Sequence, residues 1–112
     1  MFSHQNLVVY QRTIQFLATL RYVIESFPPG HSDLINQLRR AAYSIALNIA
    51  EGAGKSGAND KKRFYSIARG STLECAAVFD IIKIMDLAPK NIIKKPSAQH
   101  DENSAILGAH VF

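Results

Sequence analysis

The strongest constraint on the fold is that apolar residues recur every three or four positions along three long stretches, with helix-breaking residues between them. The run Phe27-Pro28-Pro29-Gly30 separates the first stretch from the second, and the glycine-rich run 52–57 separates the second from the third. This spacing predicts helices over 5–26 and over 33–51, and a third that starts after a cap at Ser56 or Asn59 and runs to about Asp86. Because no segment alternates strictly between apolar and polar residues, the sequence predicts an all-α protein.

The predicted helices have apolar faces that identify a candidate core. The first helix has two neighbouring apolar stripes. One comprises Leu7, Tyr10, Ile14, Leu17 and Ile24, and the other comprises Val9, Phe16, Leu20, Val23 and Phe27. The core side of the second helix comprises Leu34, Leu38, Ala41, Ala42, Ile45 and Ile49. In the third helix the expected core line is Ile67, Gly70, Ser71, Glu74, Val78, Ile81 and Met85, flanked by Phe64, Ala68, Cys75 and Ile82. Such faces are buried against one another in helical bundles.

Small and polar residues define the expected helix ends and one close contact. Ser32 or Asp33 can cap the second helix at its start, Gly52 can cap it at its end, and Ser56 or Asn59 can cap the third. A glycine inside a helix costs roughly 1 kcal/mol relative to alanine. Gly70 therefore suggests that the second and third helices approach closely at this point.

The length of 112 residues corresponds to a single domain with one core. We expect residues 1–87 to form the three-helix core of an antiparallel, up-down four-helix bundle. Residues 88–112 contain two prolines and a polar run, so we expect an atypical C-terminal segment with a fourth helix that is short or irregular. No stretch resembles a membrane span or a signal peptide, and the expected compartment is the cytoplasm.

Positive charge is concentrated in one part of the chain. The net charge is +4, and residues 52–70 carry five cations against a single acid, Asp60. The cations are Lys55, Lys61, Lys62, Arg63 and Arg69. A local basic cluster is typical of a surface that contacts nucleic-acid phosphates. The alternative interpretation is a solvated face without a partner.

A second set of polar residues falls on the faces expected to pack between helices. Its members are Gln37, Arg40, Ser44, Asn48, Glu51 and Glu74. Because a buried carboxylate needs a cation or several donors, we expect Glu74 to pair with Arg40, with Arg39 as the second choice. Arg69 could similarly pair with Glu51. The set predicts an interhelical network rather than a catalytic acid, since no histidine shares the line.

Other motifs do not indicate an enzyme or a metal site. The run Gly54-Lys55-Ser56 lacks the earlier glycine of a phosphate-binding P-loop, because position 49 is Ile. The four histidines lack the spacing of metal ligands, and Cys75 has no adjacent histidine, which favours an inert core thiol. We therefore expect no catalytic residue, no metal and no cofactor.

Two groups of motifs resemble the signature of a known family. The first runs from Gln37-Leu38-Arg39-Arg40-Ala41-Ala42 through Ser44-Ile45 to Asn48-Ile49-Ala50-Glu51-Gly52. The second comprises Phe64, Ile67-Ala68-Arg69-Gly70-Ser71 and Glu74, and Leu7-Val8-Val9-Tyr10-Gln11 and Phe27-Pro28 also fit. Over residues 5–87 the chain resembles the 23S rRNA intervening-sequence proteins, a bacterial family, and it departs from their pattern after Leu87.

The resemblance implies an antiparallel four-helix bundle that assembles as a homopentamer, without enzymatic activity. The accessory protein of diversity-generating retroelements is similar to this family, and it binds nucleic acid and a reverse transcriptase. The resemblance and the basic cluster together predict a basic oligomeric protein that binds RNA or DNA. The alternative is a structural or scaffold protein that binds a protein partner, such as a reverse transcriptase.

Overall fold

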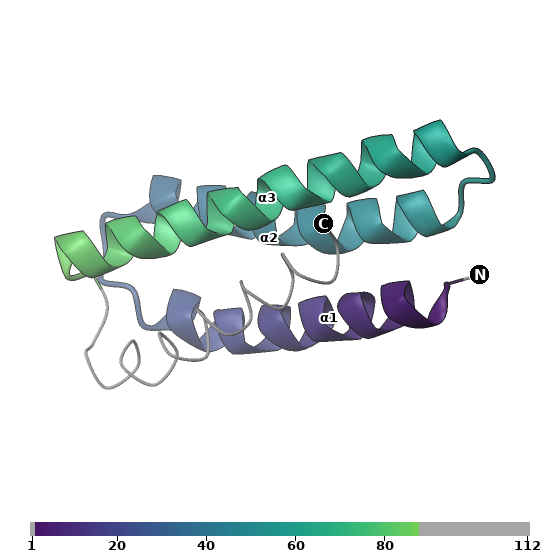
Figure 1. Cartoon of the computed structure of the whole chain (residues 1–112). Coiled ribbons are helices and arrows are strands. Elements are labelled where there is room, and N and C mark those ends of the chain that lie inside the picture. The colour runs from purple at the N-terminus through teal and green to yellow at the C-terminus, as the bar shows by residue number, and fades with distance from the viewer. Residues whose placement is uncertain (1, 88–112) are drawn as a thin grey trace.

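The computed structural model describes residues 2–87, and this part of the chain forms three long helices and no strand. They are α1 (His4–Glu25), α2 (Ser32–Ala53) and α3 (Ala58–Met85). Short connections make each helix antiparallel to the next (Figure 1). The three predicted helices are confirmed, with ends within about two residues of those expected. The expected fourth helix and the atypical segment fall in 88–112, which lies outside the described residues.

The helix ends differ from the expected caps. Ser3 caps α1, because its hydroxyl accepts a hydrogen bond from the backbone N–H of Asn6 at 3.2 Å. His31 and Gly57 precede α2 and α3, and neither helix has a side-chain cap at its start. The expected caps Ser32, Asp33, Ser56 and Asn59 are therefore wrong. At the other end of α3, Asp86 adopts the left-handed conformation, with φ 53°, and terminates the helix.

Gly52 is buried within α2, and Gly54 occupies the capping position that we expected for Gly52. The ring of Tyr65 on α3 lies directly against it, so that a Cβ added at Gly52 would meet Tyr65 Cε1 at 2.5 Å. The hydroxyl of Tyr65 accepts a hydrogen bond from Asn6 Nδ2 on α1 at 2.7 Å. Gly52 therefore makes room for a side chain that links all three helices.

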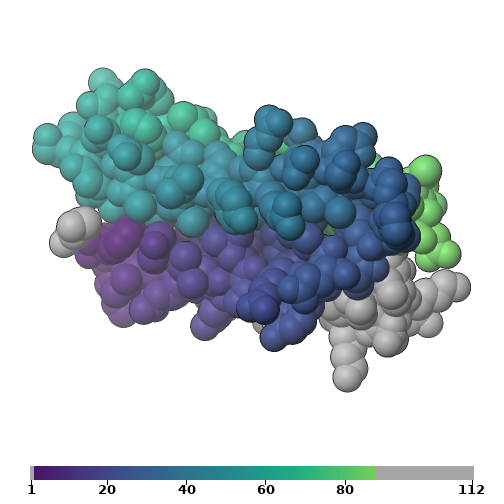
Figure 2. All heavy atoms as spheres, turned by 180° about the vertical axis from the view of Figure 1, so that it is seen from behind, coloured from purple at the N-terminus to yellow at the C-terminus, as the bar shows by residue number. Residues whose placement is uncertain are grey.

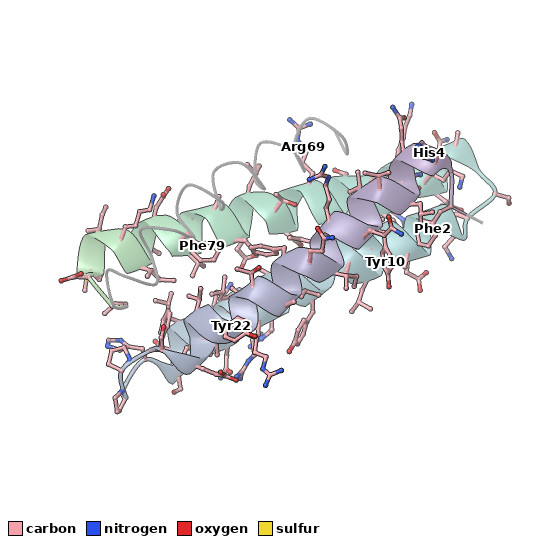
Figure 3. The ribbon with its side chains drawn as sticks, turned by 90° about the horizontal axis from the view of Figure 1, so that it is seen from below. Phe2, His4, Tyr10, Tyr22, Arg69 and Phe79 are labelled. Carbon is pink, nitrogen blue, oxygen red and sulfur yellow. The ribbon has the colours of Figure 1, made fainter. Side chains whose placement is uncertain are left out.

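The core lies where the three helices meet. α2 packs closely along α3, and α1 packs more loosely against α2. Figure 2 shows α1 and α2 side by side along one face of the molecule. Between α1 and α3 the rings of Phe16 and Phe79 meet edge to face, with centroids 6.2 Å apart. Figure 3 shows Phe79 on the inner side of α3, facing α1.

The buried face of α3 is rotated relative to the expected core line. Ser71 and Val78 are buried as expected, but Ile67, Gly70, Ile81 and Met85 are exposed. The buried residues of α3 are Ala68, Ser71, Thr72, Cys75, Val78, Phe79 and Ile82. The expected core line is therefore partly wrong, because α3 carries apolar residues on two adjacent faces and only one of them meets α1 and α2.

The close contact expected at Gly70 is also wrong. A Cβ added at Gly70 would meet nothing within 4 Å, and the residue lies on the exposed side of α3. α2 and α3 do pack closely, but through other positions, among them the buried residues Ala41, Ala42 and Ala68.

The buried polar side chains of the core are satisfied within their own helices. Thr13 donates to the carbonyl oxygen of Val9, and Thr72 donates to that of Ala68, both at 2.9 Å. In the other two helices the expected core is confirmed for Leu38, Ala41, Ala42, Ile45 and Ile49, and for Val9, Phe16, Leu20 and Val23. It is wrong for Leu7 and Ile14 of α1, which are exposed. Within residues 2–87, none of the helices has the length and apolar character required to cross a bilayer.

Candidate nucleic-acid interface

Four of the five cations of residues 52–70 gather at the end of the molecule where α2 turns into α3. We call Lys55, Lys61, Lys62 and Arg63 the basic end. The antiparallel turn places the last residues of α2 beside the first turns of α3 (Figure 1). Lys55 lies in the loop between the two helices, and the other three cations lie in the first two turns of α3. Concentrated positive charge attracts polyanions by phosphate contacts that do not depend on sequence.

Lys61 is held in a structural position within the basic end. Its Nζ atom donates to the carbonyl oxygens of Gly52 and Ala53 at 3.2 and 3.3 Å. These carbonyls close the C-terminal end of α2, where the helix dipole favours a cation. A lysine at the start of α3 is unfavourable for α3 alone, and the structure explains it by its contact with α2.

Lys55 and Arg63 share one aromatic side chain, the half-buried Phe64. The Lys55 Nζ atom lies 5.3 Å from the Phe64 ring centroid, and the Arg63 guanidinium carbon lies 4.7 Å from it. Lys55 also pairs with Glu51 at 3.7 Å. Cation–π contacts of this kind fix the position of a charged group while leaving it open to solvent.

Lys62 and Arg69 are both exposed. Lys62 forms no ion pair within residues 2–87, whereas Glu51, the expected partner of Arg69, pairs with Lys55. Figure 3 shows Arg69 projecting outward from α3. Tyr65 packs against Gly52, and burial raises its pKa. Its ring therefore serves packing between the helices.

The expected polar network forms in part. Gln37 donates to the carboxylate of Glu74 across α2 and α3, and Ser71 donates to the Ser44 hydroxyl at 2.8 Å. Asn48 donates to the carbonyl and the hydroxyl oxygens of Ser44, at 2.8 and 3.0 Å. These bonds lie along one side of the α2–α3 contact. Four of the six expected members, Gln37, Ser44, Asn48 and Glu74, therefore take part in it.

The expected ion pair between Arg40 and Glu74 is wrong. Arg40 is exposed and forms no ion pair within residues 2–87. Glu74 is only half-buried, so an amide donor is enough for its carboxylate. The helical period groups Arg40 with Gln37 and Ser44, but Arg40 is exposed, whereas Ser44 is half-buried and bonded to Ser71 of α3.

Cys75 is buried, as expected for a core thiol. Burial, with a smaller contribution from Glu74, raises the pKa of its thiol to about 12. A thiol that stays protonated is a poor nucleophile. In the described part of the chain, no group of three or more histidine, cysteine or acidic side chains is arranged to hold a metal ion.

The structure also contains a cavity that the sequence analysis missed. It lies between α1 and α2 and has a volume of about 260 Å³. Its lining is formed by Leu17, Leu20, Arg21, Ile24, Glu25, Arg39 and Tyr43. The α1 residues in this lining recur every three or four positions and therefore lie on one face of the helix. The cavity itself depends on how α1 packs on α2, and the pattern of one helix does not predict that packing.

The chain matches the family model described as 23S rRNA-intervening sequence protein over residues 5–109. The match therefore continues beyond residue 87, where we expected the resemblance to end. A search of curated proteins finds no match.

Proposed function

Because the chain belongs to the 23S rRNA-intervening sequence protein family, we propose that it is a non-enzymatic, basic helical protein that binds the phosphates of RNA or DNA. The observation that carries this proposal is the basic end. Lys55 and Arg63 are held on Phe64, and Lys62 extends into solvent beside them. Lys61 adds charge from its fixed position at the end of α2.

We further propose that the protein acts as a homo-oligomer in the cytoplasm, with a pentamer as the expected state. Several large apolar side chains of α2 and α3 are exposed in the single chain, among them Leu47 and Leu73, each 64% exposed. Exposed apolar surface of this kind is typical of an interface. Repeating a weak basic surface in each copy would strengthen phosphate binding by avidity.

Binding to RNA and DNA at several salt concentrations tests the proposal. The variant for this test changes Lys55, Lys62 and Arg63 to Gln and keeps Lys61, which bonds the last carbonyls of α2. Wild type should bind a labelled mixed-sequence RNA or DNA with an affinity that falls steeply as salt rises. The variant should lose both affinity and slope, since each lost phosphate contact lowers the slope by about 0.7 to 0.9.

A matched control removes the same charge elsewhere, with Arg12, Arg40 and Lys83 changed to Gln. All three are exposed and lie outside the basic end. The control should retain most of the binding. Equal losses in both triple variants would show that only net charge matters, and absence of wild-type binding at low salt would exclude the function.

A scaffold protein that binds a protein partner, such as a reverse transcriptase, is the second candidate. The exposed apolar side chains of α2 and α3 favour a scaffold function, because apolar surface binds protein partners and not phosphate groups. If wild type fails to bind RNA and DNA but assembles, this second function is the better explanation.

A further inference from the structure

The two aromatic rings beside the basic end make their contacts inside the protein. Phe64 is half-buried, and both Lys55 and Arg63 lie over its ring. Tyr65 packs against the end of α2, and its hydroxyl accepts the hydrogen bond from Asn6. Cations occupy the first ring and helix packing occupies the second, so neither is free to stack on an unpaired base.

A second pair of rings lies at the same end of the molecule, where α1 begins. The hydrogen bond between Asn6 and Tyr65 holds this part of α1 beside the first turns of α3. The rings of Phe2 and Tyr10 lie with their centroids 5.0 Å apart and pack against the buried core (Figure 3). These two rings therefore also serve packing within the chain.

The exposed tyrosines of residues 2–87 lie away from the basic end. Tyr22 is 66% exposed, but it belongs to the last turn of α1, at the opposite end of the molecule (Figure 3). Tyr43 is 52% exposed and lies about three turns before the end of α2. Within the described residues, the basic end is thus a charged surface whose neighbouring phenylalanine and tyrosine rings are all engaged in internal contacts.

Single strands and duplexes require different features of a protein surface. Proteins that bind single strands without sequence preference combine positive charge with aromatic rings on which successive bases stack. This stacking offsets the entropy that a flexible strand loses when it is ordered. A duplex has its bases already stacked, and it presents one phosphate charge per about 1.7 Å of its axis, twice the density of a single strand.

The cations of the basic end suit a rigid array of phosphates. Lys55 and Arg63 are held on Phe64, and Lys61 is held by the last carbonyls of α2. Side chains that are already held in place lose little further conformational entropy on binding. Fixed cations without a stacking ring therefore gain more from a duplex than from a flexible strand.

We propose that the basic end binds double-stranded RNA or DNA in preference to single strands, through phosphate contacts alone. This preference rests on the proposed function and specifies the form of nucleic acid that the same surface binds. Phe64 acts as a positioning residue, because it holds Lys55 and Arg63 and does not contact a base.

The first test uses the wild-type chain with a short duplex and with an unstructured pyrimidine strand that has the same number of phosphates. The slope of log affinity against log salt is about −0.9 per phosphate contact on a duplex and about −0.7 on a single strand. For three contacts at about 0.1 M salt, this difference alone makes duplex binding about fourfold tighter. Duplex binding should be at least this much tighter, and it should fall more steeply as salt rises.

The second test uses variants to locate the preference. The triple variant of the basic end should lose it, whereas the control triple variant should keep it. Phe64→Leu retains every charge and removes the ring. With its helical content verified, Phe64→Leu should weaken duplex binding at least as much as single-strand binding. A selective loss of single-strand binding would show that bases stack on Phe64 and would overturn the proposal.

The outcomes separate this preference from the proposed function. If wild type binds neither form at low salt, the proposed function and the preference both fail. If wild type binds the single strand as tightly as the duplex, phosphate binding stands and the preference alone is refuted. An unchanged preference in the triple variant of the basic end would also refute it, because another surface would then select the duplex.

Discussion

Replacing two glycines with alanine should have opposite effects on stability, although both lie inside helices. At Gly70 the added methyl group meets nothing within 4 Å, so only helix propensity changes. Gly70→Ala should raise the free energy of unfolding by about 0.5 to 1 kcal/mol. At Gly52 the methyl group meets the Tyr65 ring, with Cε1 at 2.5 Å and Cδ1 at 2.9 Å.

For Gly52→Ala, the overpacking must displace Tyr65. Such displacement costs typically 1 to 3 kcal/mol, and losing the hydrogen bond from Asn6 adds about 1 kcal/mol. The gain in helix propensity offsets about 1 kcal/mol of this. Gly52→Ala should therefore lower the free energy of unfolding by about 1 to 3 kcal/mol.

Urea unfolding followed by circular dichroism measures both effects, at two protein concentrations to separate folding from association. A Tyr65→Ala background supplies the control, because without the ring Gly52→Ala should no longer destabilise. If Gly52→Ala stabilises wild type as much as Gly70→Ala does, the close contact between α2 and Tyr65 is wrong.

Three further predictions follow from single contacts. Arg40→Ala should change the free energy of unfolding by less than about 0.5 kcal/mol, because Arg40 is exposed and does not pair with Glu74. A loss near ~3 kcal/mol would show instead that Arg40 and Glu74 form an ion pair. Lys61→Met should cost about 1 kcal/mol in the same urea assay, since it removes the cation at the end of α2, whereas Lys62→Met should cost less than half of that. The free energy of unfolding should fall as pH rises from about 9 towards 12, by up to about 1.4 kcal/mol per pH unit, because the unfolded Cys75 thiol ionises in this range and the folded one, with a pKa of about 12, does not. Cys75→Ala should remove this part of the pH dependence.

Local patterns in the sequence predicted the helices well, because apolar periodicity and breakers such as Pro28, Pro29 and Gly54 act within a few residues. They also predicted the core of α2, which has a single apolar face. They failed for α3, where Ile67 and Ile81 extend the apolar surface beyond the buried face. Which of two apolar faces is buried depends on the neighbouring helices, and a single sequence does not contain that information in any local pattern.

The candidate site shows the same division. The composition of residues 52–70 showed the excess of positive charge. It did not show the different structural roles of the individual lysine and arginine residues. Lys61 and Lys62 are neighbours in the sequence, yet one caps α2 and the other is solvated. Their roles depend on the approach of the end of α2, which is a tertiary feature. The same limit applies to Glu74, whose partner Gln37 is 37 positions away.

The unequal packing of the three helices has a consequence for how the chain folds. The tightest pairing joins α2 and α3, and only the few residues from Gly54 to Gly57 connect them. Closing so short a loop costs little entropy, so these two helices can zip together from the loop outward. α1 leaves the ribosome first but has the looser pairing. The apolar stripe of α1, which includes Val9, Phe16 and Leu20, therefore stays exposed in the nascent chain until α2 and α3 have been synthesised and have paired.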